Sequence, residues 1–127
     1  MDESVTIILP LPAKVLQPNT TIATIGGRMC KASASKRYRR LTAEAVGNER
    51  VETAPWEMVR VAAKFYYATN RRRDQDNATA ALKAAYDGIV DSGLVGDDDI
   101  RHMRRDSPEF AIDKDHPRVE LTIVRLQ

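Results

Sequence analysis

The sequence predicts a single α+β domain, with a mixed β-sheet and two helices in the order β-α-β-α-β-β. Two patterns lead to this prediction: apolar residues alternate with period two in the strand-like segments, and they recur at helical spacing in the two segments between them. A chain of 127 residues is long enough for one hydrophobic core and short for two, so residues 1–127 are expected to form one domain.

The first half of the chain contains one predicted strand and one predicted helix. Val5–Leu9 is a β-branched apolar run that Pro10 stops, as expected of a strand near the start of a sheet. Residues 13–32 are interpreted as a long loop. A helix is then expected to begin after Ser33 or Ser35 and to end at Gly47 and Asn48, because these residues favour helix starts and stops. Its apolar side would carry Tyr38, Leu41, Ala45 and Val46, and its opposite face Lys36, Arg37, Arg39 and Arg40.

The second half begins with the most regular alternation in the sequence, Val59–Tyr67, which predicts a strand. A second helix is expected over residues 77–90, capped by Asp76 or Asp74, closed by Ser92 and Gly93, and burying Ala78, Leu82, Ala85 and Ile89. A strand from about Ile100, a turn over Ser107–Pro117 and a final strand over Arg118–Leu126 are expected to follow.

Charge is distributed unevenly along the chain. Between Arg28 and Arg73 there are 12 Lys/Arg against 4 Asp/Glu, a local charge of +8, whereas between Asp74 and Asp115 there are 5 against 11, a local charge of −6. The first segment is suited to a polyanion and the second to cations.

Several classes of protein are disfavoured by composition. A single cysteine, Cys30, excludes an internal disulfide, and with two histidines there is no zinc cluster and no arrangement typical of a nucleophilic triad. The apolar run at Val5–Leu11 is short and interrupted by Pro10, so it predicts neither a signal peptide nor a membrane span. These observations favour a cytoplasmic protein.

Four aspartates form the candidate metal site. Asp74 and Asp76 would point to the same side of an extended segment and could share Mg²⁺, with Mn²⁺ as the other ion considered; the alternative is a helix cap plus a solvated acid. A helix over 77–90 would carry the chain about 21 Å away. Residues 91–97, nearly extended, could return about 23–25 Å. Asp97 and Asp98 could therefore lie beside the first pair, although an acidic run is also typical of a hydrophilic loop tip.

Basic residues beside these acids suit a substrate that carries phosphates. Arg71, Arg72 and Arg73 precede Asp74 directly, and together with the basic helix face they could hold phosphates while a bound metal activates water. Lys83 lies two helical turns after Asp76. Its ammonium could contact the scissile phosphate or neutralise the acids through a salt bridge, and its spacing does not distinguish the two.

The segments "RRRDQDN", Lys83-Ala-Ala-Tyr-Asp87, "SGLVGDD" and "RVELTIVRL" resemble the RusA family of Holliday junction resolvases. The family pattern is Arg-Asp-x-Asp-Asn, a lysine, Asp, a glycine turn and Asp-Asp. The resemblance implies a homodimer that binds branched DNA, such as a four-way junction, and cuts phosphodiester bonds with Mg²⁺ during recombination and repair. It also implies catalytic roles for Asp74, Asp76, Asp98 and Lys83, with Asp97 beside Asp98.

The chain departs from the family pattern at the lysine, which stands seven rather than four residues after the second aspartate. The direction of Lys83 on a helix is roughly kept, but it lies about 4.5 Å farther along the axis. One of Arg71–Arg73 could therefore take over its role. Two other functions remain: a non-catalytic DNA-binding module in which the acids only cap and solvate, and a Mg²⁺-dependent hydrolase of small phosphate compounds.

Overall fold

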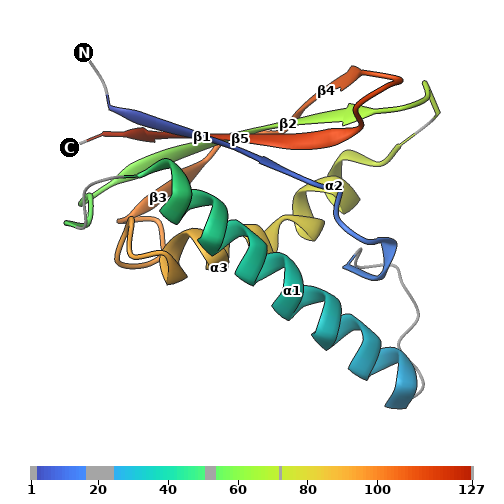
Figure 1. Ribbon diagram of the computed structural model, residues 1–127, viewed down its shortest axis with the longest axis horizontal. Coiled ribbons are helices and arrows are strands. Elements are labelled where there is room, and N and C mark those ends of the chain that lie inside the picture. The colour runs from blue at the N-terminus through green and yellow to red at the C-terminus, as the bar shows by residue number, and fades with distance from the viewer. Residues whose placement is uncertain (1–2, 17–24, 51–53, 72, 127) are drawn as a thin grey trace.

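The computed structural model describes residues 3–16, 25–50, 54–71 and 73–126. They form one small α+β domain around a mixed five-stranded sheet (Figure 1). The strands are β1 (Ser4–Leu9), β2 (Val59–Tyr67), β3 (Met103–Arg105), β4 (Glu109–Ile112) and β5 (Arg118–Arg125).

The strands are ordered β1-β5-β2, and β3 and β4 follow one another along the remaining edge of β2. β5 is antiparallel to both of its neighbours, whereas β3 pairs in parallel with residues 59–61 of β2 and β4 with residues 64–67. The last residues of β2 and β4 therefore lie at the same end of the sheet. Residue 73 and the helix after it follow from this end, so the sheet positions the acidic motif.

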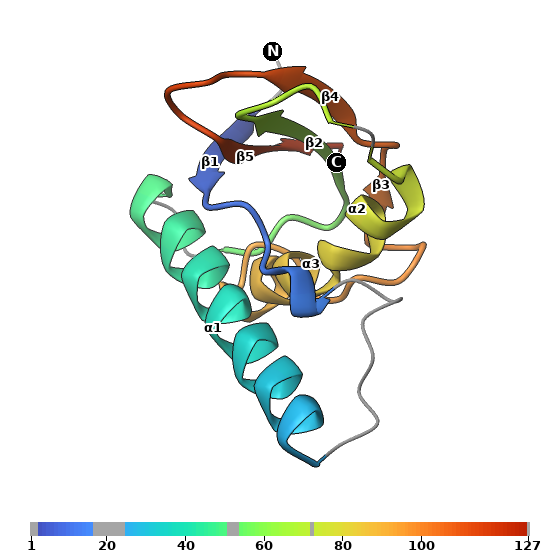
Figure 2. The same cartoon turned by 90° about the vertical axis from the view of Figure 1, so that its right-hand side faces the viewer.

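All helices lie on one side of the sheet (Figure 2). They are α1 (Ile25–Glu49), α2 (Gln75–Ala81), α3 (Lys83–Asp91) and the short 3-10 helix η1 (Lys14–Leu16). α2 and α3 form one nearly continuous helix with a tighter turn at Leu82, whose N–H donates to the Thr79 carbonyl three residues back. They correspond to the single second helix predicted over residues 77–90.

The core fills the space between the sheet and the helices. Alternate residues of β1, β2 and β5 are buried, and the predicted second-helix stripe is buried as well: Ala78, Leu82, Ala85 and Ile89. The Tyr38 hydroxyl donates a 2.7 Å hydrogen bond to the Pro10 carbonyl, which ties α1 to the end of β1. The strand alternation and the second helix are therefore confirmed.

α1 and α3 pack closely enough to require a glycine at their contact. A Cβ atom at Gly88 would lie 2.4 Å from the Arg39 carbonyl oxygen and 2.7 Å from Cβ of Thr42. Arg39 also forms a bidentate ion pair with Asp91 at the end of α3. These contacts fix the position of α3 against α1.

Some predictions about the elements are wrong. α1 begins at Ile25, eight residues before Ser33, because residues 28–32 also favour a helix and extend it toward the N-terminus. Residues 17–24 of the predicted loop 13–32 lie outside the described part of the chain. Leu41 is 37% exposed and Thr42 is fully buried, with its hydroxyl bonded to the Tyr38 carbonyl at 2.8 Å. Packing on α3, rather than apolarity, selects the buried residue.

The third predicted strand begins later than expected, and the predicted turn contains an additional strand. The N–H groups of His102 and Met103 both donate to the Asp99 carbonyl, so residues 99–102 form a turn and β3 starts at Met103 rather than near Ile100. β4 lies within the predicted turn Ser107–Pro117, because these residues form backbone hydrogen bonds with the edge of β2 that β5 leaves unpaired. Among the described residues, no helix is long and apolar enough to cross a membrane.

Candidate functional site

The acidic motif lies where the chain leaves the sheet and α2 begins. Asp74 is the N-cap of α2: its backbone is extended, and its Oδ1 accepts hydrogen bonds from the N–H groups of Asp76 at 2.8 Å and Asn77 at 3.3 Å. Asp76 lies in the first helical turn, where the negative charge of a carboxylate interacts favourably with the helix dipole. The expectation that both aspartates lie in an extended segment is therefore wrong, because Asp76 is helical.

Asp98 lies against two cations from different elements. Its Oδ2 is 2.5 Å from Nζ of Lys83, at the start of α3, and 3.0 Å from Nη2 of Arg105, at the end of β3. Lys83 also contacts Asp87 at 3.0 Å, and the Arg105 guanidinium lies 4.4 Å from the centre of the Tyr86 ring. The chain thus returns to the helix at Lys83, not to the predicted place beside Asp74 and Asp76, and Lys83 forms the salt bridge that was one of its two alternatives.

The ion pair shifts both partners toward their charged forms. The hydrogen bond from Lys83 lowers the pKa of Asp98, and the same bond raises the pKa of Lys83. Asp98 is consequently a carboxylate at neutral pH that is already neutralised by protein groups. Sequence reasoning missed Arg105, which no motif marks and which only the pairing of β3 with β2 brings to this position.

The four predicted metal ligands are not gathered into one group. Within residues 3–16, 25–50, 54–71 and 73–126, no three His, Cys, Asp or Glu side chains are placed to hold a metal ion together. Oδ1 of Asp97 accepts a 2.7 Å hydrogen bond from the Asp98 N–H, and Asp74 caps its own helix. This arrangement does not fit a metal ion held by three carboxylates.

Three adjoining pockets extend from the end of β2 past α2 to α1, and we call them together the groove. The central pocket, of about 740 Å³, lies beside the start of α2. The aromatic pocket, of about 470 Å³, shares Tyr67, Arg71 and Arg73 with it. The basic pocket, of about 490 Å³, lies between α1 and the α2–α3 junction and shares Ala81 with the central pocket.

The groove is strongly cationic. Among its described lining residues there are six cations against one carboxylate, Asp74 in the central pocket. The central pocket also contains Asn77, the asparagine of the sequence motif. The cations are Lys14, Arg28, Lys31, Arg71, Arg73 and Lys83.

The predicted basic residues do not all lie in the groove. Arg71 and Arg73 line it, whereas Arg72 lies outside the described residues. Arg39 is paired with Asp91. The remaining predicted residues, Lys36, Arg37 and Arg40, are exposed on α1 and line none of the three pockets.

Two further cations, Arg28 and Lys31, were missed because their segment was interpreted as a loop. Once α1 is extended to Ile25, Arg28, Lys31 and Ser35 follow one another at offsets of three and four residues and share a face. The helical spacing of Arg28, Lys31 and Ser35 was the signal in the sequence that could have placed these cations on the first helix.

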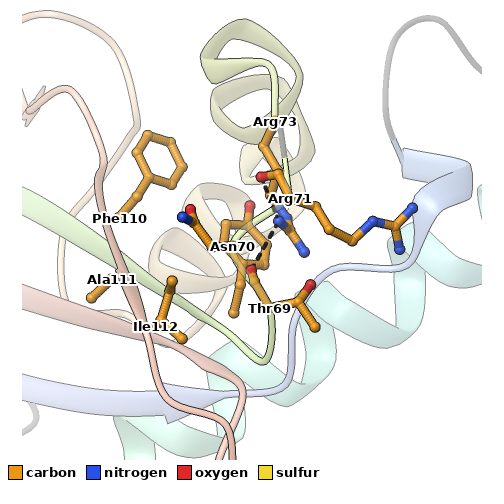
Figure 3. A pocket seen from close by; sticks show the side chains of 8 residues that line it. Thr69, Asn70, Arg71, Arg73, Phe110, Ala111 and Ile112 are labelled. Carbon is orange, nitrogen blue, oxygen red and sulfur yellow. Dashed lines mark hydrogen bonds between the residues drawn. The ribbon is translucent and has the colours of Figure 1, made fainter.

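Arg73 is held in a defined orientation between the central and aromatic pockets. Its Nη1 donates to the carbonyls of Thr69 at 3.3 Å and Arg71 at 2.9 Å (Figure 3). The guanidinium lies 3.8 Å from the centre of the Tyr67 ring. Arg73 therefore organises the loop between β2 and α2 and presents its charge at a fixed place.

Comparison with known proteins adds no relative: no protein-family model matches the chain, and no curated protein sequence matches it.

Proposed function

We propose that this protein is an endodeoxyribonuclease of the RusA type that binds branched DNA, such as a Holliday junction, in the groove and cuts its phosphodiester backbone during recombination and repair. The observation that carries the proposal is the cationic groove with Asp74 and Asn77 in its central pocket, because a polyanion fits this charge and Asp74 stands where its backbone would pass. The ordered motif from Arg71 to Asp98 agrees with it.

In this proposal the cations position the strand. Arg71, Arg28 and Lys31 contact phosphates, and Arg73, oriented by two carbonyls, contacts the strand beside α2. Asp76 is exposed in the first turn of α2 and lines none of the three pockets, and its side chain makes no hydrogen bond or ion pair within the described part of the chain, so in this proposal it is free to turn toward the bound strand. Lys83, which lines the basic pocket, and Asp98 act as a charge pair.

The proposal includes Mg²⁺ as the cofactor, with Mn²⁺ as an alternative, and its support is the sequence motif. The described side chains supply no three-carboxylate site, and Asp98 would have to exchange Lys83 and Arg105 for the ion to become a ligand. Two symmetric cuts in a four-way junction require two sites, so the proposed active form is a homodimer.

A specific observation favours a second candidate, a DNA-binding module without catalytic activity. Asp74 already caps α2, and Asp98 is already neutralised by two cations. Both acids thus have structural roles that require no chemistry. In this case binding would weaken with salt and would not depend on Mg²⁺ or on Asp76.

Cleavage of an end-labelled synthetic four-way junction distinguishes the two candidates. The junction and a linear duplex of the same sequence are incubated with and without Mg²⁺ or Mn²⁺, using the wild type, Asp76→Asn and the matched control Glu57→Gln. Glu57 is an exposed acid just before the other end of β2, and its side chain makes no hydrogen bond or ion pair within the described part.

For the nuclease, we expect paired symmetric nicks by the wild type and Glu57→Gln and none by Asp76→Asn, with the metal required. Junction binding by all three proteins without cutting under either metal would assign the groove to a binding module. Absence of binding to any DNA would refute both candidates.

A further inference from the structure

We propose that the aromatic pocket binds an unpaired nucleobase of the strand that lies in the groove. The inference rests on the proposed function only in that the substrate is a nucleic acid, and it does not require cleavage. It assigns a role to Phe110, Ile112 and Asn70, which belong to no part of the acidic motif.

The first observation is a cluster of three aromatic rings that reaches the surface. Phe65 is buried, and the ring centres of Tyr67 and Phe110 lie 5.8 and 5.5 Å from its own, with interplanar angles of 21° and 30°. Tyr67 and Phe110 are nearly parallel, at 10° and 6.2 Å. Phe110 is 42% exposed, so the cluster presents one aromatic side chain on which another flat ring can pack.

The second observation is the apolar exposure beside Phe110. Ile112, two residues along the same short edge strand, is 53% exposed and lines the same pocket. Exposed large apolar side chains that share one concave site are typical of ligand-binding surfaces. The pocket volume of about 470 Å³ is in the range of sites for small molecules and cofactors.

The third observation is the polar wall on the other side. Figure 3 shows the side-chain amide of Asn70 extending toward Phe110. The side-chain amide of Asn70 has no partner within the described residues, and it offers a donor and an acceptor together. A base edge presents the same combination, so the amide complements a base stacked on Phe110.

The link to a strand comes from the residues that the aromatic and central pockets share. Arg71 and Arg73 line both, so a phosphate at these guanidinium groups would be covalently connected to a base that reaches Phe110. A free aromatic metabolite would not need the cations along α2, whereas an unpaired nucleotide of a nucleic acid uses both features. Bulges and single-stranded loops contain such nucleotides, and a paired base can be flipped out of the stack into a protein pocket.

The test compares DNA ligands that differ only in one base. Dissociation constants are measured for a duplex with a single unpaired base, for the same duplex with an abasic residue in that place, and for the fully paired duplex. The wild type should bind the unpaired base more tightly than the abasic ligand by about 5- to 100-fold, since stacking of one base on an aromatic side chain has this magnitude.

Phe110→Ala and Phe110→Leu should both lose this preference and still bind the abasic ligand as the wild type does. Leucine keeps an apolar side chain at the edge strand, so it separates loss of the ring from a disturbed fold, which circular dichroism checks for both variants. The control Ile8→Ala, which changes an exposed apolar residue of β1, should retain the preference.

Equal binding of the base and abasic ligands by the wild type would overturn the inference, and so would a preference that survives in both Phe110 variants. A change of oligomeric state in these variants, measured by light scattering, would instead assign the surface to a protein interface. A protein that cuts junctions but ignores the base refutes this inference alone, whereas one that binds no DNA refutes it together with the proposed function.

Discussion

Asp98 and Asp74 are both carboxylates of the acidic motif, and each already has protein partners. Asp98 is bonded to Lys83 and Arg105, which lowers its pKa, with the Lys83 hydrogen bond as the main cause. Asp74 accepts two backbone N–H groups at the start of α2. For each residue, a structural role and a role in cleavage can therefore be separated by choosing the substitution.

At Asp74 the substitutions are alanine and asparagine. Asparagine is as good an N-cap as aspartate, whereas alanine is not, so Asp74→Ala should lower the free energy of unfolding by about 1 kcal/mol and Asp74→Asn by a few tenths at most. Urea denaturation measures both. Cleavage should be lost in both variants if the carboxylate takes part in the reaction. An active Asp74→Asn protein would show that Asp74 serves as a helix cap and not in cleavage.

At the scale of elements, the approach of α3 to α1 decides where the two halves of the motif lie. α3 begins with Lys83 and leads to the loop that carries Asp98. Its distance from α1 is set at Gly88, where the Arg39 carbonyl leaves no space for a side chain. The packing of these helices therefore also sets the width of the basic pocket between α1 and the α2–α3 junction.

Gly88→Ala should destabilise the fold by about 1–3 kcal/mol or more, because the added methyl group collides with the backbone of a packed helix. The matched control is Gly47→Ala in α1, where a Cβ would meet nothing within 4 Å; it should stabilise by about 0.5 kcal/mol through helix propensity. Urea midpoints of the two variants test this, and similar midpoints for both would contradict the close packing of α1 and α3.

For the whole molecule, ion pairs between distant segments make stability depend on pH. The hydrogen bond with Arg39 lowers the pKa of Asp91, and that with Lys83 lowers the pKa of Asp98. A carboxyl whose pKa is lower in the folded than in the unfolded state stabilises the fold above its unfolded pKa of about 4. This stability is lost as the pH falls from there through the folded pKa.

The urea midpoint should accordingly be higher at pH 7 than at pH 3. Asp91→Asn removes one of the titrating groups and should show a smaller difference between the two pH values than the wild type. Asp115→Asn, which changes an exposed acid of the β4–β5 turn whose side chain makes no hydrogen bond or ion pair within the described residues, serves as the control. Equal acid sensitivity of the wild type and Asp91→Asn would exclude a contribution from the Arg39 pair.

Local pattern alone was sufficient for much of this molecule. A β-branched apolar run identified β1, period-two alternation identified β2 and β5, and the spacing of Ala78, Leu82, Ala85 and Ile89 identified the helix that contains α2 and α3. Residue type marked the end at Ser92 and left Asp76 or Asp74 as the cap, of which the structure has Asp74. These features depend on neighbours within a few residues, so they are visible without knowledge of the packing.

Contacts between distant segments were determined by the tertiary structure alone. The pairing of Asp98 with Lys83 and Arg105, the burial of Thr42 in place of Leu41, and the strand β4 depend on how α1, α3 and the edge of β2 come together. The three pockets around α2 arise in the same way, from residues brought together by β2, β4 and α1. The physical reason is that long-range packing chooses among partners that local spacing leaves equivalent.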